Sequence, residues 1–218
     1  MAEASIAELM EELRRRREPA ECLRELRPAE SLERSARQVP SGVPELDQLC
    51  GGWPIGALSE VVEGAGGASG LLYAALGAAF ARGESCALVD PFRSLDMPSA
   101  QAAALPLERL LWVCPPDERR AARAVELLLE SGGFALIVLD LRAVPPGSES
   151  LPTSVWLRLA RRARTAAALV LALVSRPRVH APALSLRVDC DARWQGDLRE
   201  LRLRFQLRRG DPRGVRHG

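Results

Sequence analysis

Residues 63–70, which read EGAGGASG, are the stretch of this sequence whose residue types and spacing come nearest to chemistry. A strand-like segment, ALSEVV, precedes the stretch, and an apolar segment typical of a helix opens at Leu71. A strand, a glycine-rich loop and a helix in this order form the plan of a phosphate-binding loop, where backbone N–H groups and the positive end of a helix meet an anion. The loop residues that we assign to this plan are Glu63, Gly64, Gly66, Gly67, Ser69 and Gly70.

The side chains that such a loop needs for nucleotide chemistry are missing. A working loop reads G-x-x-x-x-G-K-[ST], with the lysine on the β- and γ-phosphates and the hydroxyl on Mg²⁺. If Glu63 takes the first glycine position, Ser69 falls on the lysine position and Gly70 on the hydroxyl position. If Gly64 takes it, those positions fall on Gly70 and Leu71, and the whole chain contains no lysine. The sequence therefore predicts a loop that turns the chain and does not hold a triphosphate.

The elements around the loop predict an α/β fold with a mostly parallel sheet flanked by helices. Nearly uniform apolar runs occur at 86–90, 110–114, 134–141 and 168–174, with helical patterns at 116–131 and 155–164. Strands that alternate with helices and are apolar throughout are typical of a parallel sheet covered on both faces. From Ala183 the apolar period changes to two, which predicts antiparallel strands at the C-terminal edge of the sheet.

An N-terminal segment precedes this core. An apolar stripe with i, i+3, i+4, i+7 spacing predicts a helix, and its members are Ile6, Leu9, Met10 and Leu13. Two interpretations stay open: a helix folded onto its own core, or an arm that docks on a partner. We expect a helical arm at 1–38, a core at 39–209 and a disordered tail at 210–218.

Charge is spread unevenly although the net charge is only +2. Residues 39–157 carry 7 Arg against 14 acids, and residues 158–218 carry 15 Arg against 5 acids. This polarity suggests an acidic partner for the last quarter, either nucleic acid or a protein face. We favour the protein face because only Trp156 and Trp194 could stack on bases there. The candidate basic surface consists of Arg158, Arg161, Arg162, Arg164, Arg202, Arg204, Arg208 and Arg209.

The five cysteines are widely spaced and form no C-x-x-C pair. Neither a disulfide framework nor a zinc site fits this pattern, which favours a reducing cytoplasm. We see no signal peptide and no apolar run long enough for a membrane span. We expect no metal and no cofactor.

Residues of about 39–175 resemble the core of RecA-type recombinases. The resemblance rests on four segments in the family's order: SGVPELDQLCGGWPIGALSEVV, CALVDPFRSLD, LERLLWVCPPD and FALIVLDL. The most specific likeness is to the shorter RecA relatives called ImuA, sometimes labelled SulA-like. That family is encoded with ImuB, a polymerase-like protein, and an error-prone DnaE-type polymerase. The resemblance implies a RecA-like core.

The resemblance also assigns the catalytic positions of the recombinases. The acid at the end of a central strand falls on Asp140 and is retained, whereas the water-orienting glutamate falls on Phe92 and the sensor glutamine near Ser175. Phosphoryl transfer needs charge stabilisation and a positioned water, so we expect a degenerate ATPase. We expect Asp140 to be a solvated or capping acid and no arginine to lie in or beside the loop. The DNA-binding loops of the family would fall at 143–152 and 176–182, both reduced.

The resulting expectation is a non-catalytic RecA-like accessory protein of SOS-induced translesion synthesis. The resemblance implies contacts with an ImuB-like polymerase-fold protein and with RecA, and a possible effect on the RecA filament. Alternatives are a module that binds single-stranded or non-specific DNA through the C-terminal arginines, with weak and salt-sensitive affinity, and a weak atypical NTPase. A cell-division inhibitor, suggested by the SulA-like label, ranks last because no residue pattern favours it.

Overall fold

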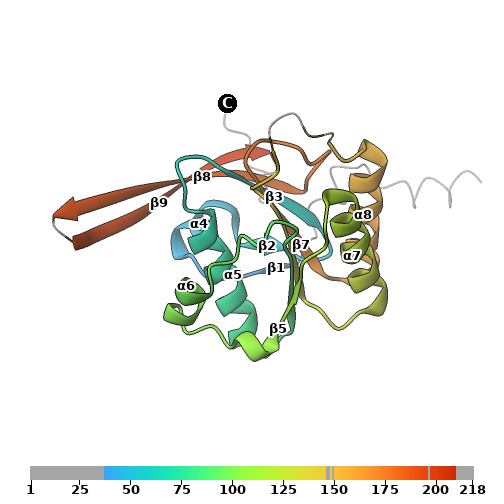
Figure 1. Ribbon diagram of the computed structural model, residues 1–218, viewed down its shortest axis with the longest axis horizontal. Coiled ribbons are helices and arrows are strands. Elements are labelled where there is room, and N and C mark those ends of the chain that lie inside the picture. The colour runs from blue at the N-terminus through green and yellow to red at the C-terminus, as the bar shows by residue number, and fades with distance from the viewer. Residues whose placement is uncertain (1–36, 146–147, 149, 196, 210–218) are drawn as a thin grey trace, which may run out of the picture. The chain divides into compact units, whose positions relative to one another are not determined.

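Residues 37–145, 148, 150–195 and 197–209 are described by a computed structural model, shown in Figure 1. The predicted N-terminal helix with its stripe and the predicted tail from 210 lie outside these residues. For residues 192–195, 197–201 and 209 the backbone alone is described. Within the described residues, no helix has the length and apolar character needed to cross a bilayer.

A seven-stranded sheet organises the described chain, with strand order β5-β4-β6-β7-β3-β8-β9. All neighbouring pairs are parallel except β8 with β9. This confirms the predicted α/β class, its mostly parallel sheet and its antiparallel C-terminal edge. The strands span Leu58–Glu63 (β3), Cys86–Val89 (β4), Leu110–Val113 (β5), Leu136–Leu141 (β6), Leu169–Val174 (β7), Leu184–Gln195 (β8) and Asp197–Arg209 (β9). Two short strands, Gln38–Val39 (β1) and Trp53–Pro54 (β2), pair separately.

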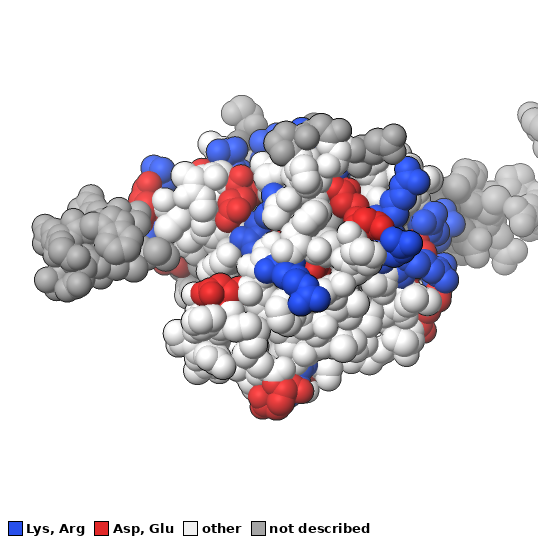
Figure 2. All heavy atoms as spheres, in the orientation of Figure 1, with Lys and Arg blue, Asp and Glu red and all other residues white. Residues whose placement is uncertain are grey.

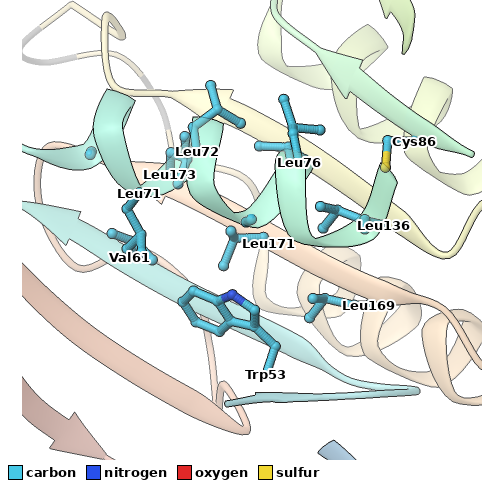
Figure 3. Close-up of a cluster of buried hydrophobic side chains, with 14 of the residues drawn as sticks. Trp53, Val61, Leu71, Leu72, Leu76, Cys86, Leu136, Leu169, Leu171 and Leu173 are labelled. Atoms are coloured by element: carbon cyan, nitrogen blue, oxygen red, sulfur yellow. The ribbon is translucent and has the colours of Figure 1, made fainter. Parts of the chain in front are cut away.

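Helices cover both faces of this sheet (Figure 1). They are Pro44–Cys50 (α4), Ala68–Ala81 (α5), Met97–Ala102 (α6), Glu118–Ser131 (α7) and Thr153–Ala166 (α8), with a 3₁₀ turn at Leu107–Arg109 (η1). The first hydrophobic core joins α4, α5 and α6 to one face, and Figure 3 shows Leu72 and Leu76 of α5 with Trp53 and Leu171 in it. The second joins α7 and α8 to the other face through residues such as Trp156. Because β4, β6 and β7 contribute to both cores, every one of their residues is buried, which explains their apolar runs.

At the C-terminal edge, the predicted antiparallel pair consists of β8 and β9. Strand β8 is parallel to β3 over Leu184–Val188, and only β9 is antiparallel. Beyond Val188, β8 pairs with β9 alone, so the two strands continue as a ribbon past the sheet (Figure 1). Alternation of apolar and polar residues reports one buried face, and it carries no information about strand direction.

Candidate functional site

The glycine loop follows β3 and ends at the first turn of α5. Gly66 and Gly67 have φ values of +91° and +99°, which L-residues with a side chain rarely adopt, and Gly64 and Gly66 form an isolated bridge. The helix begins at Ala68, so Ser69 and Gly70 lie in its first turn. The predicted order of strand, glycine turn and helix is therefore present.

Three backbone N–H groups in and beside this loop bond to the protein itself. Gly64 donates to the carbonyl of Val188 at 2.8 Å, and Ala65 donates to Asp189 Oδ1 at 2.8 Å. Ala68 donates to Glu63 Oε1 at 3.3 Å. The N–H of Ala65 and then the guanidinium of Arg187 hold the pKa of the Asp189 carboxyl below its usual value. Two carboxylates of the chain thus accept hydrogen bonds that a phosphate would accept in a working loop.

A guanidinium lies beside the same loop. Arg142 Nη1 donates to Ser69 Oγ at 2.8 Å and to Glu63 Oε1 at 3.4 Å. Its Nε and Nη2 bind Asp140 at 3.0 and 2.7 Å. The Arg142 side chain is 10% exposed and that of Asp140 is 1% exposed. Burial alone would lower the pKa of Arg142, but hydrogen bonding to Asp140 and the charges of Asp140 and Glu63 outweigh burial and raise it. We call these four residues, Arg142, Asp140, Glu63 and Ser69, the arginine plug.

The arginine plug corrects two sequence predictions. Asp140 is not solvated, because it is buried and ion-paired, but it does cap the end of β6: its Oδ1 accepts a hydrogen bond from the backbone N–H of Arg142 at 3.1 Å. The prediction that no arginine lies in or beside the loop is also wrong. Parallel strands bring their carboxyl ends to one edge of the sheet, so the segment after β6 meets the segment after β3 although 73 residues separate Arg142 from Ser69. The signal available in sequence was the spacing of Asp140 and Arg142, since alternate residues of an extended segment share a face.

The other catalytic positions that the resemblance to recombinases assigns lie apart from the plug. Phe92 is half-buried and packs against the second core, and Ser175 is exposed just after β7. Among the described residues, no group of three or more His, Cys, Asp or Glu side chains is placed to hold a metal ion. Burial raises the pKa of the Cys86 thiol to about 12, so this buried cysteine is unreactive.

Glu60 is a buried acid that the sequence interpretation missed. It is 2% exposed and accepts hydrogen bonds from the backbone N–H groups of Arg178 and Val179 at 2.7 and 2.8 Å. It also accepts one from Ser185 Oγ at 2.8 Å. The Arg178 guanidinium binds both oxygens of Glu118, at 2.8 and 3.1 Å. One carboxylate therefore pins the segment 176–182, and its buried arginine is not available to DNA. The signal in sequence was an acid in the interior of the predicted strand.

The predicted basic surface is partly neutralised within the chain. Arg158 pairs with Glu126 and Arg162 with Glu130, across the contact between α8 and α7. On β9, Leu203, Phe205 and Leu207 pack against the first core, so the alternating Arg202, Arg204 and Arg208 point away from it. Arg204 pairs with Asp191 at 3.0 Å. The exposed arginines Arg161, Arg164 and Arg208 have no acidic partner among the described residues. The side chain of Arg209, like the N-terminal stripe, is outside the described part.

Side chains of β8 and β9 leave little room for a side chain at Gly67, and this gives a first prediction. A Cβ there would lie 2.9 Å from Leu203 Cδ2 and 3.2 Å from Val188 Cγ2, at a φ of +99°. We expect Gly67→Ala to lower the free energy of unfolding by about 2 kcal/mol, from strain and crowding together. Urea denaturation followed by circular dichroism measures the change.

Gly70→Ala is the matched control. Nothing lies within 4 Å of its added Cβ, and the position is in the first turn of α5. Because alanine favours a helix over glycine, this control should leave stability unchanged or raise it by about 0.5 kcal/mol. Equal stabilities of the two variants would contradict the described loop conformation.

The fold and the site together define an α/β protein in which the chain's own charged groups occupy a phosphate-type loop. A family model described as MT3502 N-terminal domain matches residues 51–178. The match covers more than half of the chain, and this protein belongs to that family. The matched segment includes the loop, Asp140, Arg142 and Arg178. The chain matches no protein of curated function.

Proposed function

We propose that this protein is a non-catalytic, RecA-like accessory protein of SOS-induced translesion DNA synthesis that acts through contacts with other proteins. The observation that carries the proposal is the arginine plug. The Arg142 guanidinium is bound to Ser69, the residue at the position of the phosphate-loop lysine, and to Glu63 beside it. Its partner Asp140 is the strand-end acid that the resemblance gives as retained. In a working site this acid would lie on the side of the bound metal ion.

Electrostatics support a site closed to nucleotides. A triphosphate at this loop would meet three carboxylates, those of Glu63, Asp140 and Asp189. Only two guanidinium groups pair with them, because Arg142 serves both Glu63 and Asp140 and Arg187 serves Asp189. It would also have to displace Asp189 from the N–H of Ala65. Hydrolysis needs stabilisation of the transferred phosphoryl group, and loss of one such contact alone costs about 10²–10³ in rate. A chain without the lysine, the hydroxyl and the water-orienting acid has none of these contacts.

The partners in this proposal come from the resemblance to the ImuA family. They are an ImuB-like polymerase-fold protein and RecA, in the cytoplasm. A RecA-like core that does not bind nucleotide has no ATP-driven cycle of its own, and its surfaces remain as its working parts. We propose that such surfaces act on the RecA filament or on the polymerase-like protein.

Two measurements on the full-length chain test this proposal. In calorimetry with ATP and Mg²⁺, we expect no binding tighter than about 1 mM, because the loop is closed by its own charges. In cross-linking with purified RecA and with the polymerase-like partner, we expect capture of at least one, equally with and without ATP. Micromolar ATP binding, or the absence of capture of both proteins, would refute the proposal.

A DNA-binding module is the second candidate, favoured by the exposed Arg161, Arg164 and Arg208, which have no acidic partner in the part of the chain that the structure describes. Phosphate contacts would make its affinity for single-stranded DNA fall steeply with salt. The pairing of Arg158, Arg162 and Arg204 with acids of the chain weighs against it.

A further inference from the structure

A hollow of about 600 Å³ lies between α7 and α8, on the face of the sheet opposite to α5. Figure 2 shows basic and acidic side chains gathered on the side of the molecule that these two helices form. Three arginines, Arg158, Arg161 and Arg162, line the hollow together with one acid, Glu130. Apolar groups also line it, among them those of Leu129 and Ala166. We call this feature the arginine hollow.

Glutamates of α7 hold two of these arginines in place. Glu126, 3% exposed, accepts from Arg158 Nε and, at 2.9 Å, from Arg123 Nη1. Burial alone would raise the pKa of Glu126, but the hydrogen bonds from Arg158 and Arg123 outweigh it and the pKa lies below its usual value. Glu130 accepts from Arg162 Nη1. Arginines fixed in this way lose little side-chain entropy when they bind a further group.

The hollow keeps unused capacity for anions. A guanidinium has five N–H donors, whereas Arg158 spends Nε and Arg162 spends Nη1 on the glutamates. Their side chains are 46% and 32% exposed. Arg161 is exposed and has no acidic partner in the described residues. The lining carries three arginines and one glutamate, which leaves two positive charges in excess. Glu126 and Arg123, beside the lining, neutralise each other.

We propose that the arginine hollow docks a segment of a partner protein that carries both carboxylates and apolar side chains. This inference rests on the proposed function, in that it assumes action through protein contacts. Carboxylates bind Arg161 and the spare donors of Arg158 and Arg162, and an apolar side chain covers Leu129 and Ala166. Arginine is suited to such sites because its planar fork binds carboxylates bidentately.

The lining favours an acidic protein segment over nucleic acid. Single-stranded nucleic acids bind where aromatic side chains stack on bases beside a continuous basic groove. Among the described residues, no aromatic side chain lines the hollow, and a glutamate interrupts its basic edge. Apolar groups in the lining match side chains of a peptide and have no counterpart in a phosphate backbone.

A synthetic peptide tests the proposal on the full-length chain. The probe is a fluorescein-labelled peptide of about 16 residues with Glu and Leu on one helical face, long enough to be partly helical. Its twin carries Gln in place of every Glu. We expect fluorescence anisotropy to give at least about tenfold tighter binding for the Glu peptide, because charge-assisted hydrogen bonds to arginine are lost in the twin.

Variants assign the binding to the hollow. We expect Arg161→Glu to weaken binding of the Glu peptide at least about tenfold through like-charge repulsion. Arg208→Glu is the matched control, since Arg208 is also exposed and lies on β9 outside the hollow lining. It should change the affinity less than about twofold. Circular dichroism establishes that both variants are folded.

Three outcomes overturn the docking site. The first is equal affinity for the two peptides, and the second is an equal effect of Arg161→Glu and Arg208→Glu on the affinity for the Glu peptide. The third is a higher affinity for labelled oligothymidine than for the Glu peptide, if Arg161→Glu lowers the oligothymidine affinity. Cross-linking with RecA and the polymerase-like protein separates this inference from the proposed function. Capture that persists in Arg161→Glu leaves the proposed function standing and refutes the hollow as its docking site. Peptide binding that depends on Arg161, without capture of either protein, refutes the proposed function and leaves the docking site standing.

Discussion

Replacement of Arg142 by alanine is expected to lower the free energy of unfolding by about 3–5 kcal/mol, the range for breaking a buried ion pair by removing one partner. Asp140 is 1% exposed, and the variant leaves its carboxylate in that position without the guanidinium. Ser69 Oγ also loses its 2.8 Å contact. Urea denaturation of the two proteins gives the difference directly.

Two companions make this prediction specific. Arg164→Ala removes an exposed arginine without an ion-pair partner in the described chain and should change stability by less than about 0.5 kcal/mol. Asp140→Asn together with Arg142→Ala removes both charges, and a double-mutant cycle should show a coupling of about 1–3 kcal/mol. A loss below about 1 kcal/mol for Arg142→Ala would mean that the plug is not a buried pair in solution.

Glu60→Ala is expected to destabilise the protein by a similar amount, about 3–5 kcal/mol. The variant leaves three buried or half-buried donors without an acceptor, namely the N–H groups of Arg178 and Val179 and the hydroxyl of Ser185. Each unsatisfied buried donor costs about 1–3 kcal/mol. Hydrogen exchange provides a second measurement, because the amides of Arg178 and Val179 should exchange faster.

Glu60→Gln is the matched control for this site. Its side-chain carbonyl oxygen retains an acceptor for the two backbone N–H groups, and its amide group can donate to Ser185 Oγ. We expect a loss of about 1 kcal/mol and nearly unchanged exchange at the two amides. Losses below about 1 kcal/mol for both Gln and Ala would contradict a role of the carboxylate in pinning the segment 176–182.

Both predictions concern contacts that determine what the loop and its surroundings can do. The arginine plug occupies the start of α5, and Glu60 holds a segment that corresponds, by the resemblance, to a DNA-binding loop of recombinases. In the proposed accessory protein, side chains of the chain itself satisfy positions that would otherwise face nucleotide and DNA. We propose that partners bind the exposed sides of α7 and α8.

Much of the architecture followed from local patterns. The apolar runs at 134–141 and 168–174 predicted strands buried on both faces, and β6 and β7 lie in the middle of the sheet. The glycines at 66 and 67 predicted a turn, and both have positive φ. Such features are predictable because burial and backbone freedom act on each segment separately.

By itself the sequence determined that the loop lacks a lysine and a hydroxyl where nucleotide chemistry requires them. Only the tertiary structure decided which side chain lies at the lysine position: Arg142 binds Ser69, although 73 residues separate them. The tertiary structure also decided that Glu60 accepts a hydrogen bond from Arg178, 118 residues away. It also decided that β8 runs parallel to β3. These contacts depend on the order of the strands in the sheet, because neighbouring strands of a parallel sheet are distant in the chain. Periodicity in the sequence indicates which face of a strand is buried, but it does not indicate which segment lies beside that strand.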